Sequence, residues 1–285
     1  MKRILRAAFL LHRVFFMQLF HLGREGGPVR QDVSPLVIWF LTKYEHLEMR
    51  TLHYLATSDW IYRHGATKAL VNWLRKRVVA VANGEVLTMG EAKEMLDSLF
   101  DGGYTVAVGT CPCRRALKKY SEDVPNETDM AFGPWAERYL RTYPDMYRKI
   151  SYTEAVELIE EFDRFGLVHQ VYGLKTLEGG GVVVCNCCSE VCVPLLAQQL
   201  RGFESFRKGR SRAVSDPEAC LGVEECGTCI ERCVFGARVS RDGKAHVDPD
   251  ACFGCGLCVS PCRGQATKLE RVPGAELIYA KHLVS

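Results

Sequence analysis

The chain has 285 residues, of which 47% are hydrophobic and 25% are charged, and its formal net charge is +3. This composition excludes a disordered acidic chain and a strongly basic nucleic-acid binder, and the length suits two domains better than one. The apolar stretches are too short, and too often interrupted by Arg or His, to span a bilayer. The 14 cysteines stand at close spacings, which favours metal ligation over a secreted disulfide scaffold.

Residues 1–26 predict a basic amphipathic helix. The segment is rich in Lys and Arg and has no acidic residue before Glu25. At helical spacing the cations fall on one side, and Leu and Phe cover much of the rest. Such a helix is typical of attachment, either to a membrane interface through residues 2–22 or to the protein itself or a partner subunit. Arg13 interrupts the apolar region and no small-residue cleavage site follows, which argues against a signal peptide.

Residues 27–200 are predicted to form a cysteine-containing α/β domain. Its first part, residues 27–82, is rich in aromatic residues at helical intervals. A group of two Glu and two His in this part matches no metal-binding motif, and we interpret it as a solvated helix face: Glu45, His46, Glu48 and His53.

A repeat follows within the same domain. Residues 87–113 resemble residues 150–172 together with residues 179–187. In each copy a capping box begins a helix, a glycine ends it, and an apolar β-prone run follows, so two helix–strand units are expected. The two boxes are Thr88 with Glu91 and Ser151 with Glu154.

Both units end in a Cys-x-Cys motif, and six cysteines fall in this domain: Cys111, Cys113, Cys185, Cys187, Cys188 and Cys192. Residues i and i+2 of an extended chain face the same way, so the two thiols of each motif should converge. Cys188 and Cys192 share a face if Ser189 begins a helix. We expect an iron–sulfur cluster here, with a zinc site or buried free cysteines as alternatives, and the spacing leaves open which four thiols ligate.

Three further residues stand close to these cysteines. Arg114 and Arg115 follow the first motif directly, where they either raise the potential of a cluster or form a solvated pair of charges. His169 is interpreted as a satisfied core or surface group rather than a cluster contact. No phosphate-binding loop, dinucleotide fingerprint or haem-attachment motif occurs in the chain.

The last part of the chain is predicted as a basic linker over residues 201–215, a second domain over residues 216–269, and a tail over residues 270–285. A second repeat lies in this domain, where DPEAC at residue 216 matches DPDAC at residue 248. Each copy opens a run of four cysteines. The runs are Cys220-x5-Cys226-x2-Cys229-x3-Cys233 and Cys252-x2-Cys255-x2-Cys258-x3-Cys262.

This pattern resembles the bacterial-type dicluster ferredoxin family over roughly residues 213–269. The resemblance implies a small bacterial-ferredoxin-like domain with two 4Fe-4S clusters and crossed ligation. One cluster is then held by Cys220, Cys226, Cys229 and Cys262, and the other by Cys252, Cys255, Cys258 and Cys233. The chain departs from the family where Val234 and Arg263 replace a proline and where residues 221–225 lengthen one loop. A zinc ribbon is the alternative, because paired Cys-x2-Cys motifs also bind zinc. Eight cysteines in a two-fold repeat with x2-x2-x3 spacing are a more specific match to the ferredoxin pattern.

The expected fold class is therefore α+β, with a helix-rich N-terminal domain and a small C-terminal ferredoxin-like domain. Cys-Pro-Cys-Arg with Cys-Asn-Cys-Cys is also similar to a group of anaerobe iron–sulfur proteins with a terminal ferredoxin, which supports a third cluster. The leading function is electron transfer to a partner oxidoreductase or its subunits, in the cytoplasm or on the cytoplasmic face of a membrane. One alternative is a reductase whose six-cysteine site is catalytic. The other is a redox- or metal-sensing regulator, suggested by a weak resemblance of residues 154–171 to a winged-helix unit and ranked last because residues 154–164 are acidic, whereas a recognition helix would be basic.

Overall fold

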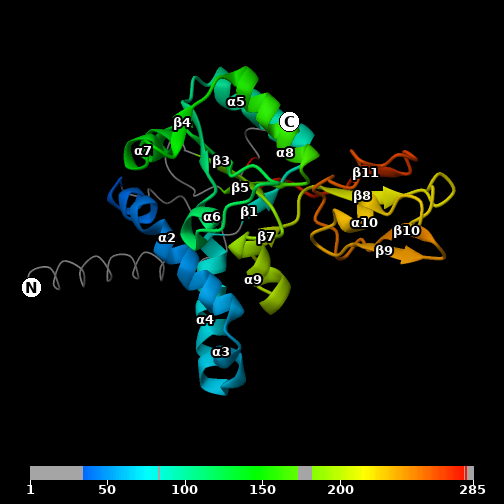
Figure 1. The fold of residues 1–285 in the computed structure, drawn as a ribbon, viewed down its shortest axis with the longest axis horizontal. Coiled ribbons are helices and arrows are strands. Elements are labelled where there is room, and N and C mark those ends of the chain that lie inside the picture. The colour runs from blue at the N-terminus through cyan, green and yellow to red at the C-terminus, as the bar shows by residue number, and fades with distance from the viewer. Residues whose placement is uncertain (1–34, 83, 173–181, 279, 281–285) are drawn as a thin grey trace, which may run out of the picture.

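The computed structural model describes residues 35–82, 84–172, 182–278 and 280. These residues form both helices and strands, which confirms the α+β class (Figure 1). The basic helix predicted over residues 1–26 lies outside the described residues.

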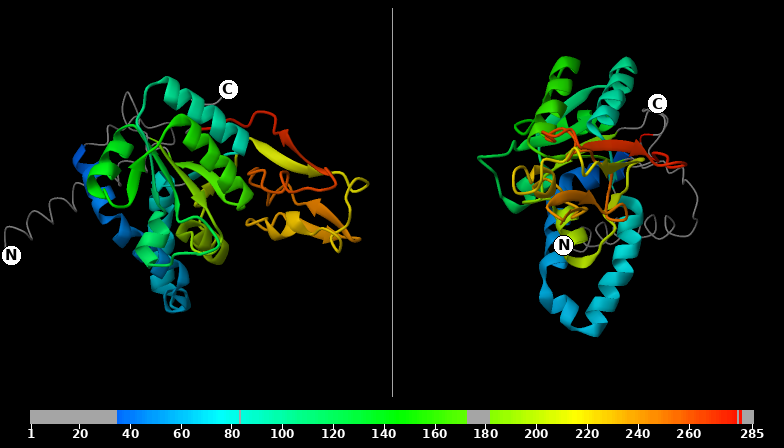
Figure 2. Two further views of the ribbon diagram at one scale, coloured as in Figure 1. Left: turned by 45° about the horizontal axis from the view of Figure 1, so that its top comes forward. Right: turned by 90° about the vertical axis from the view of Figure 1, so that its right-hand side faces the viewer.

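The described chain begins with a helical hairpin that projects from the sheet (Figures 1 and 2). It comprises α2 (Pro35–Thr57), α3 (Asp59–Arg63) and α4 (Gly65–Ala82). The helical prediction for residues 27–82 is thus confirmed over residues 35–82. Within the described part of the chain, no helix is both long and apolar enough to cross a membrane.

Seven strands form the central sheet, in the order β4-β2-β3-β6-β5-β1-β7. Along the chain they are β1 (Gly84–Val86), β2 (Val106–Thr110), β3 (Glu127–Phe132), β4 (Tyr147–Lys149), β5 (Val168–Tyr172), β6 (Val183–Cys187) and β7 (Phe206–Arg207). The edge strand β7 pairs parallel with β1, and the other neighbours are antiparallel. Because β2 and β6 both run antiparallel to β3, they run in the same direction and end at the same edge of the sheet.

Helices α5 (Met89–Asp101) and α8 (Tyr152–Arg164) pack side by side on one face of this sheet (Figure 1). Helix α5 precedes β2 and helix α8 precedes β5, as the two predicted helix–strand units require. A short strand, β1 or β4, comes before each helix. The capping box of α5 is confirmed, because Thr88 and Glu91 each accept a backbone N–H from the other. At α8, Ser151 caps the helix, but the Glu154 side chain pairs with Arg148 instead of closing the box.

The opposite face carries α6 (Pro112–Leu117), α7 (Pro134–Thr142) and α9 (Val193–Arg201), with α2 packed across all three. Side chains alternate along the strands, so that Val106 and Val108 join the core under α5 and α8, whereas Ala107 lies under α7. Gly109 continues this second face, where a side chain would clash with the ring of Tyr147 on the neighbouring strand. The two Cys-x-Cys motifs lie on the same side of the sheet as α2, α6 and α9.

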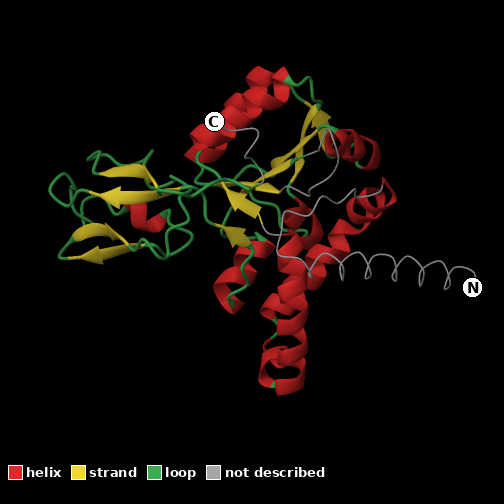
Figure 3. Cartoon of the chain, turned by 180° about the vertical axis from the view of Figure 1, so that it is seen from behind, coloured by secondary structure: helices red, strands yellow, loops and turns green. Residues whose placement is uncertain are grey.

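A second lobe, made mostly of strands and loops, follows the sheet (Figure 3). Strands β8 (Ser211–Ser215) and β11 (Thr267–Arg271) form one antiparallel pair, and β9 (Arg238–Arg241) and β10 (Lys244–Val247) form another. A single turn of helix, α10 (Thr228–Glu231), lies between β8 and β9 in the chain. We call residues 211–271 the C-terminal module.

The interpretation of residues 201–215 as a linker is wrong, because the segment contains β7 and β8 and is packed at several points. Phe203 and Phe206 are buried. Arg210 is buried as well, and its Nε lies 2.5 Å from Oε1 of Glu91 at the start of α5. The scarcity of periodic apolar residues suggested a linker, but two aromatic side chains and one buried ion pair hold the segment in place.

Residues 270–285 are also more than a tail. Arg271 still belongs to β11, and Leu277 and Ala280 are buried in the core between the sheet and the helices α5 and α8. The backbone N–H of Ile278 donates to the buried Glu85 carboxylate, at 2.6 Å. The chain therefore returns from the C-terminal module to the N-terminal domain.

Candidate metal centres

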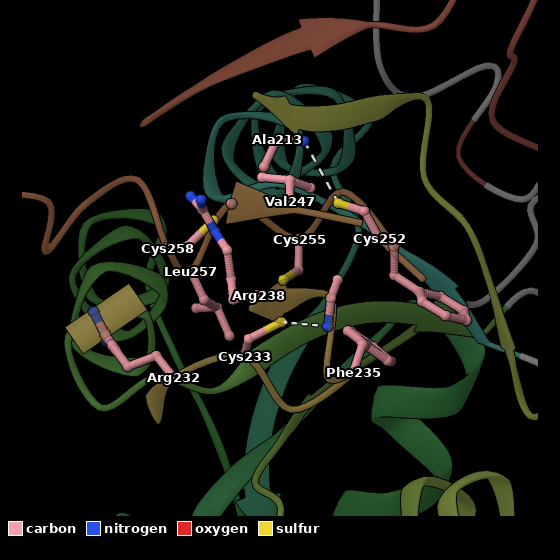
Figure 4. Close-up of a pocket in the computed structure, with 13 residues that line it drawn as sticks. Ala213, Arg232, Cys233, Phe235, Arg238, Val247, Cys252, Cys255, Leu257 and Cys258 are labelled. Atoms are coloured by element: carbon pink, nitrogen blue, oxygen red, sulfur yellow. Dashed lines mark hydrogen bonds between the residues drawn. The ribbon is translucent and has the colours of Figure 1, made fainter. Parts of the chain in front are cut away.

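The eight cysteines of the C-terminal module surround two pockets. The proximal pocket, so called because it faces the N-terminal domain, is lined by Cys233, Cys252, Cys255 and Cys258 (Figure 4). The distal pocket is lined by Cys220, Cys226, Cys229 and Cys262. The structure thus groups the thiols into the same two sets as the crossed ligation expected from the ferredoxin resemblance.

The duplicated DP-x-AC segments fold into the same local turn. Asp216 and Asp248 each accept the backbone N–H two residues further on, at 2.9 Å in both cases. The N–H of Cys220 then donates to the carbonyl of Asp216, as that of Cys252 does to Asp248. This turn positions the first cysteine of each run. Between Cys252 and Cys255, the backbone at Gly254 passes so close to the carbonyl oxygen of Ser211 that a side chain would not fit.

Backbone N–H groups point at sulfur atoms in both pockets. In the proximal pocket, Ala237 donates to Cys233 at 3.2 Å and Ala213 donates to Cys252 at 3.5 Å (Figure 4). In the distal pocket, backbone donors lower the pKa of Cys220. Such bonds stabilise thiolates, the form in which cysteine binds metals, so the donor set fits an iron–sulfur cluster.

The two departures from the ferredoxin pattern have structural roles. Arg263, which stands in place of a proline, donates to the carbonyl of Glu225 in the lengthened loop, at 2.6 Å, and its side chain also hydrogen-bonds Cys226. Val234, at the other proline position, packs against the N-terminal domain. One substitution therefore supports the longer loop, and the other contributes to the contact between domains.

One cation, Arg238, is buried beside the pockets. Its exposed fraction is 4%, and it donates to Thr267 at 2.7 Å and to Ser215. It lines the proximal pocket next to Cys258 (Figure 4), and its charge lowers the pKa of Cys229 in the distal pocket as well as that of Cys258. Burial outweighs this effect and raises the pKa of both thiols.

In the N-terminal domain, five of the six cysteines form a continuous set of contacting thiols. We call this set the N-terminal thiol cluster: Cys111, Cys113, Cys192, Cys187 and Cys185. In that order, each thiol hydrogen-bonds the next one. The contact with Cys113, together with burial, raises the pKa of the Cys111 thiol. Among the described residues, no group of three or more His, Cys, Asp or Glu side chains has metal-binding geometry, and this holds for the N-terminal thiol cluster as well as for the two pockets of the C-terminal module.

The fold explains why these thiols meet. Cys111 directly follows β2, and Cys187 ends β6, two strands that end at the same edge of the sheet. A register shift at Gly109 and Thr110 precedes the first motif. Cys113 lies in the first turn of α6 rather than in an extended chain, so this pair converges through a helix start, which differs from the expected strand geometry.

Cys188 does not belong to the thiol cluster. It follows Cys187 directly, so its side chain turns to the opposite face and packs against the core under α5 and α8. Its sulfur accepts a hydrogen bond from Nη2 of Arg114 at 3.1 Å. The condition under which Cys188 and Cys192 would share a face, a helix beginning at Ser189, is not met, because α9 begins at Val193 with Cys192 as its N-cap. Of this pair, Cys192 alone reaches the cluster.

A buried polar chain leads away from Cys185. Its thiol donates to Oδ1 of Asp129 at 3.0 Å, and the hydroxyl of Tyr147 donates to Oδ2 at 2.5 Å. The ring of Tyr147 stacks on Tyr139 with 4.6 Å between centroids, and the hydroxyl of Tyr139 donates to Glu45 at 2.9 Å. Burial raises the pKa of Asp129 and brings that of Glu45 to about 7.

Sequence reasoning missed this chain. The signals were an aspartate inside an apolar strand and tyrosines four residues apart at positions 139, 143 and 147. The interpretation of Glu45 as part of a solvated helix face is wrong, because its side chain is only 15% exposed and pairs with Arg115. Arg115 also lies over the ring of Tyr143, at 4.0 Å.

The interpretation of Arg114 and Arg115 as a solvated pair is likewise wrong. Both side chains are buried, with exposed fractions of 3% and 8%, and each has an acidic partner, Glu190 or Glu45. His169 faces away from the thiols and shares a 2.6 Å hydrogen bond with Asn186, while burial lowers its pKa. It lies in the core, as expected, but its buried Nε2 has no hydrogen-bond partner among the described residues, so the expectation of a satisfied group is confirmed only in part.

The proximal pocket and the N-terminal thiol cluster adjoin one apolar cluster. Leu257 of the pocket packs there with Phe206, Leu195 and Cys187, and Cys255 packs against the same group. Phe235 stacks on Phe253 at 4.2 Å and meets Phe206 edge-on. Two hydrogen bonds, from Gln199 to Val234 at 2.7 Å and from Arg232 to Arg164 at 2.8 Å, also join the two domains.

No protein-family model matches the chain, and a search of curated proteins gives no match either.

Proposed function

We propose that the protein transfers electrons through two 4Fe-4S clusters in the C-terminal module and a third iron–sulfur cluster at the N-terminal thiol cluster. The observation that carries this proposal is the division of eight cysteines between two pockets in the crossed order typical of dicluster ferredoxins. The duplicated ligand runs and the two helix–strand units support the proposed architecture, a ferredoxin-like domain fused to a helix-rich domain. When bound, such clusters supply one-electron redox chemistry.

The contact between domains supports a relay. The proximal pocket adjoins the N-terminal thiol cluster through buried apolar side chains, whereas the distal pocket lies on the other side of the module. Three of the four cysteines of the distal pocket are half-buried (Cys220, Cys226 and Cys262), against two in the proximal pocket (Cys233 and Cys255). We therefore propose that an external redox protein exchanges electrons at the distal side and that the N-terminal centre is the other end of the relay.

A reductase is the second candidate, and the Asp129 chain favours it. A relay has no need for buried proton-bearing groups, yet the carboxyl of Asp129 and the hydroxyl of Tyr147 are linked to Cys185. The two functions differ in one measurement. If protons accompany electrons at the N-terminal centre, its potential falls by about 59 mV per pH unit, the value for one proton per electron, whereas a pure relay shows little dependence.

The proposed location is the cytoplasm or the cytoplasmic face of a membrane. All fourteen cysteines are free, which suits a reducing compartment. Attachment through residues 2–22 remains a proposal, tested by comparing the binding of the full chain and a chain lacking residues 2–24 to anionic vesicles.

Anaerobic purification of the full chain, followed by iron and sulfide analysis and EPR of the reduced protein, tests the main proposal. We expect about twelve iron and twelve sulfide per chain, the content of three cubanes, and interacting 4Fe-4S signals. Zinc without sulfide would falsify the ferredoxin interpretation. About eight iron per chain, with no third EPR signal, would support the two clusters of the C-terminal module and refute the N-terminal cluster.

A further inference from the structure

The helical hairpin of α2, α3 and α4 exposes large apolar side chains that the proposed electron transfer does not use. Four of them have exposed fractions between 43% and 58%: Tyr54, Trp60, Leu70 and Trp73. Helix α3 lies at the end of the hairpin farthest from the sheet (Figures 1 and 2). We call residues 58–73 the hairpin tip. Proteins seldom gather apolar side chains of this size on one projecting element unless that element contacts something else.

Helix α4 is apolar on two opposite sides. Its inner side carries Val71, which is buried with Ile61 and Phe203 in a small core against α9. The outer side carries four exposed apolar residues, which fall within a stripe of about 100° at 3.6 residues per turn: Ala66, Ala69, Leu70 and Trp73. A helix that packs on one side normally has polar residues on the other, so the outer stripe indicates a second contact surface.

The hairpin is also basic. Residues 49–84 contain six Lys or Arg residues and one acidic residue, Asp59. The Asp59 carboxylate lies 2.7 Å from Arg201 of α9, so a cation from outside the hairpin offsets its charge. Arg63 and Lys68 are exposed at the hairpin tip. This surface thus combines Trp and Leu with positive charge, a composition typical of segments that lie in the interface of an anionic membrane.

Charge argues against the occupants that the chain itself could supply. Residues 1–24 contain five Lys or Arg residues and no acid, so the basic hairpin would repel them. A second copy in a symmetric contact would bring an equally basic surface against this one. The exposed side chains also lie on a projecting end of the molecule (Figure 2), which suits a flat lipid surface.

We propose that the hairpin tip is a membrane-contact surface, in which Trp60 and Leu70 enter the interface of an anionic bilayer and Arg63 and Lys68 bind its headgroups. This inference goes beyond the proposed electron transfer and depends on none of the proposed clusters. The C-terminal module projects from the sheet in a different direction from the hairpin (Figure 1), so the hairpin can meet a membrane without the module contacting it.

Sedimentation of the anaerobically purified full chain with vesicles tests this surface. One set of vesicles contains phosphatidylcholine and phosphatidylglycerol in equal amounts, and the other contains phosphatidylcholine alone. We expect binding to the anionic set only, weakened about tenfold by Trp60→Ser or Leu70→Ser and about fivefold by Lys68→Gln. Phe165→Ser and Lys149→Gln are the matched controls, because both side chains are exposed at sites outside the hairpin.

Tryptophan fluorescence separates this contact from any binding through residues 2–22. Brominated phosphatidylcholine in the anionic vesicles quenches the emission of tryptophans that reach the lipid. We expect partial quenching in the wild type and a smaller quenched fraction in Trp60→Phe, whose phenyl ring keeps the apolar contact. An equal quenched fraction in both proteins would contradict the proposed position of Trp60.

Three other results would overturn the inference. If the three hairpin variants bind anionic vesicles as the controls do, any vesicle binding belongs to residues 2–22. If the full chain binds neither set of vesicles, the hairpin tip does not contact lipid and is left for a protein partner. If the wild type is a dimer in solution and Leu70→Ser is a monomer, the surface contacts a second copy. Unchanged iron content in each variant confirms that the fold is intact.

Discussion

The C-terminal module and the N-terminal thiol cluster assemble sulfur atoms in opposite ways. In the module, Cys252, Cys255 and Cys258 follow one another within a single loop, and a repeated turn delivers each run. In the N-terminal domain, Cys113 and Cys192 meet from helices far apart in the chain. A centre built from local loops can be recognised by spacing, whereas a centre built from distant elements exists only through the fold.

Their electrostatic surroundings also differ. The module pockets share the buried cation Arg238, and the N-terminal thiol cluster lies beside the buried acid Asp129, with Glu45 further along the same chain. Arg115 offsets part of this negative charge, because it pairs with Glu45 and its charge also lowers the pKa of Asp129, whereas Arg114 pairs with Glu190. The structure thus indicates a cationic environment for the proposed ferredoxin clusters and an acidic one for the third.

The largest predicted effect tests whether the two regions form one folding unit. Arg210→Met removes one partner of the buried ion pair with Glu91, where both side chains are less than 10% exposed. A buried carboxylate without its partner costs about 3–5 kcal/mol of unfolding free energy. We expect the unfolding transitions of the sheet, followed by far-UV circular dichroism, and of the module, followed by cluster absorbance, to shift down together.

Arg141→Met is the control, because its pair with Glu137 is exposed on α7 and should contribute less than about 1 kcal/mol. Equal stabilities of the two variants, or a shift in only one of the two signals, would show that the Arg210 contact does not couple the regions.

Tyr147→Phe isolates the polar chain at the N-terminal centre. The substitution keeps a ring to stack on Tyr139 but leaves Oδ2 of Asp129 buried without its donor, at a cost of about 1–3 kcal/mol. The iron content of the C-terminal module should not change. Tyr120→Phe, at a side chain that is 57% exposed, should have little effect on the midpoint of thermal unfolding. An unchanged midpoint in Tyr147→Phe contradicts the assigned hydrogen bond.

The sequence predicted the parts of this contrast that depend on local patterns. Capping residues located α5 and α8, and the resemblance to dicluster ferredoxins implied the two sets of cysteines that the pockets group together. The order of strands, in which β1 lies beside β5 and β4 beside β2, carries no local signal.

Long-range packing explains what was missed. In the sequence Glu45 resembles any exposed helix residue, and it is buried only because α2 packs across α6 and α7. Arg210 likewise resembles a cation of a linker, because nothing in the sequence indicates its contact with Glu91. Residues 270–285 likewise read as a tail until Leu277 enters a core formed by residues far earlier in the chain. Such contacts depend on which elements become neighbours, and single-segment patterns do not encode that.

Glu48→Gln tests, through the pH dependence of stability, whether the N-terminal region contains a buried acid with a raised pKa. Burial raises the pKa of Glu48 from 4.5 to about 7, so the folded chain keeps a proton that the unfolded chain releases near pH 4.5. The contribution of this group to stability therefore falls as pH rises from about 4.5 to 7. Glu48→Gln should flatten that slope and stabilise the protein at pH 8 by about 1–2 kcal/mol, after allowance for partial exposure.

Denaturant unfolding at pH 5, 6, 7 and 8 measures the Glu48 effect, with Glu122→Gln on an exposed loop as the matched control. A slope identical to that of the wild type would mean that Glu48 is ionised in the folded protein throughout this range.

Arg238→Gln should have the smallest effect, and it separates the two regions by redox potential. A cation favours the reduced, more negative cluster, and Arg238 acts on Cys258 in the proximal pocket and on Cys229 in the distal one. Removing its charge should lower both module potentials by on the order of 1 kcal/mol per electron. The effect should be larger at the proximal side, where Arg238 also hydrogen-bonds Cys258.

Arg238→Lys is the control, because it keeps the charge and should retain most of the potential. Potentiometric titration followed by EPR resolves the clusters, and the third signal should not move, because the cation lies in the module. An equal shift of all three signals, or the same shift in the lysine variant, would show that the substitution acts through structure and not through charge.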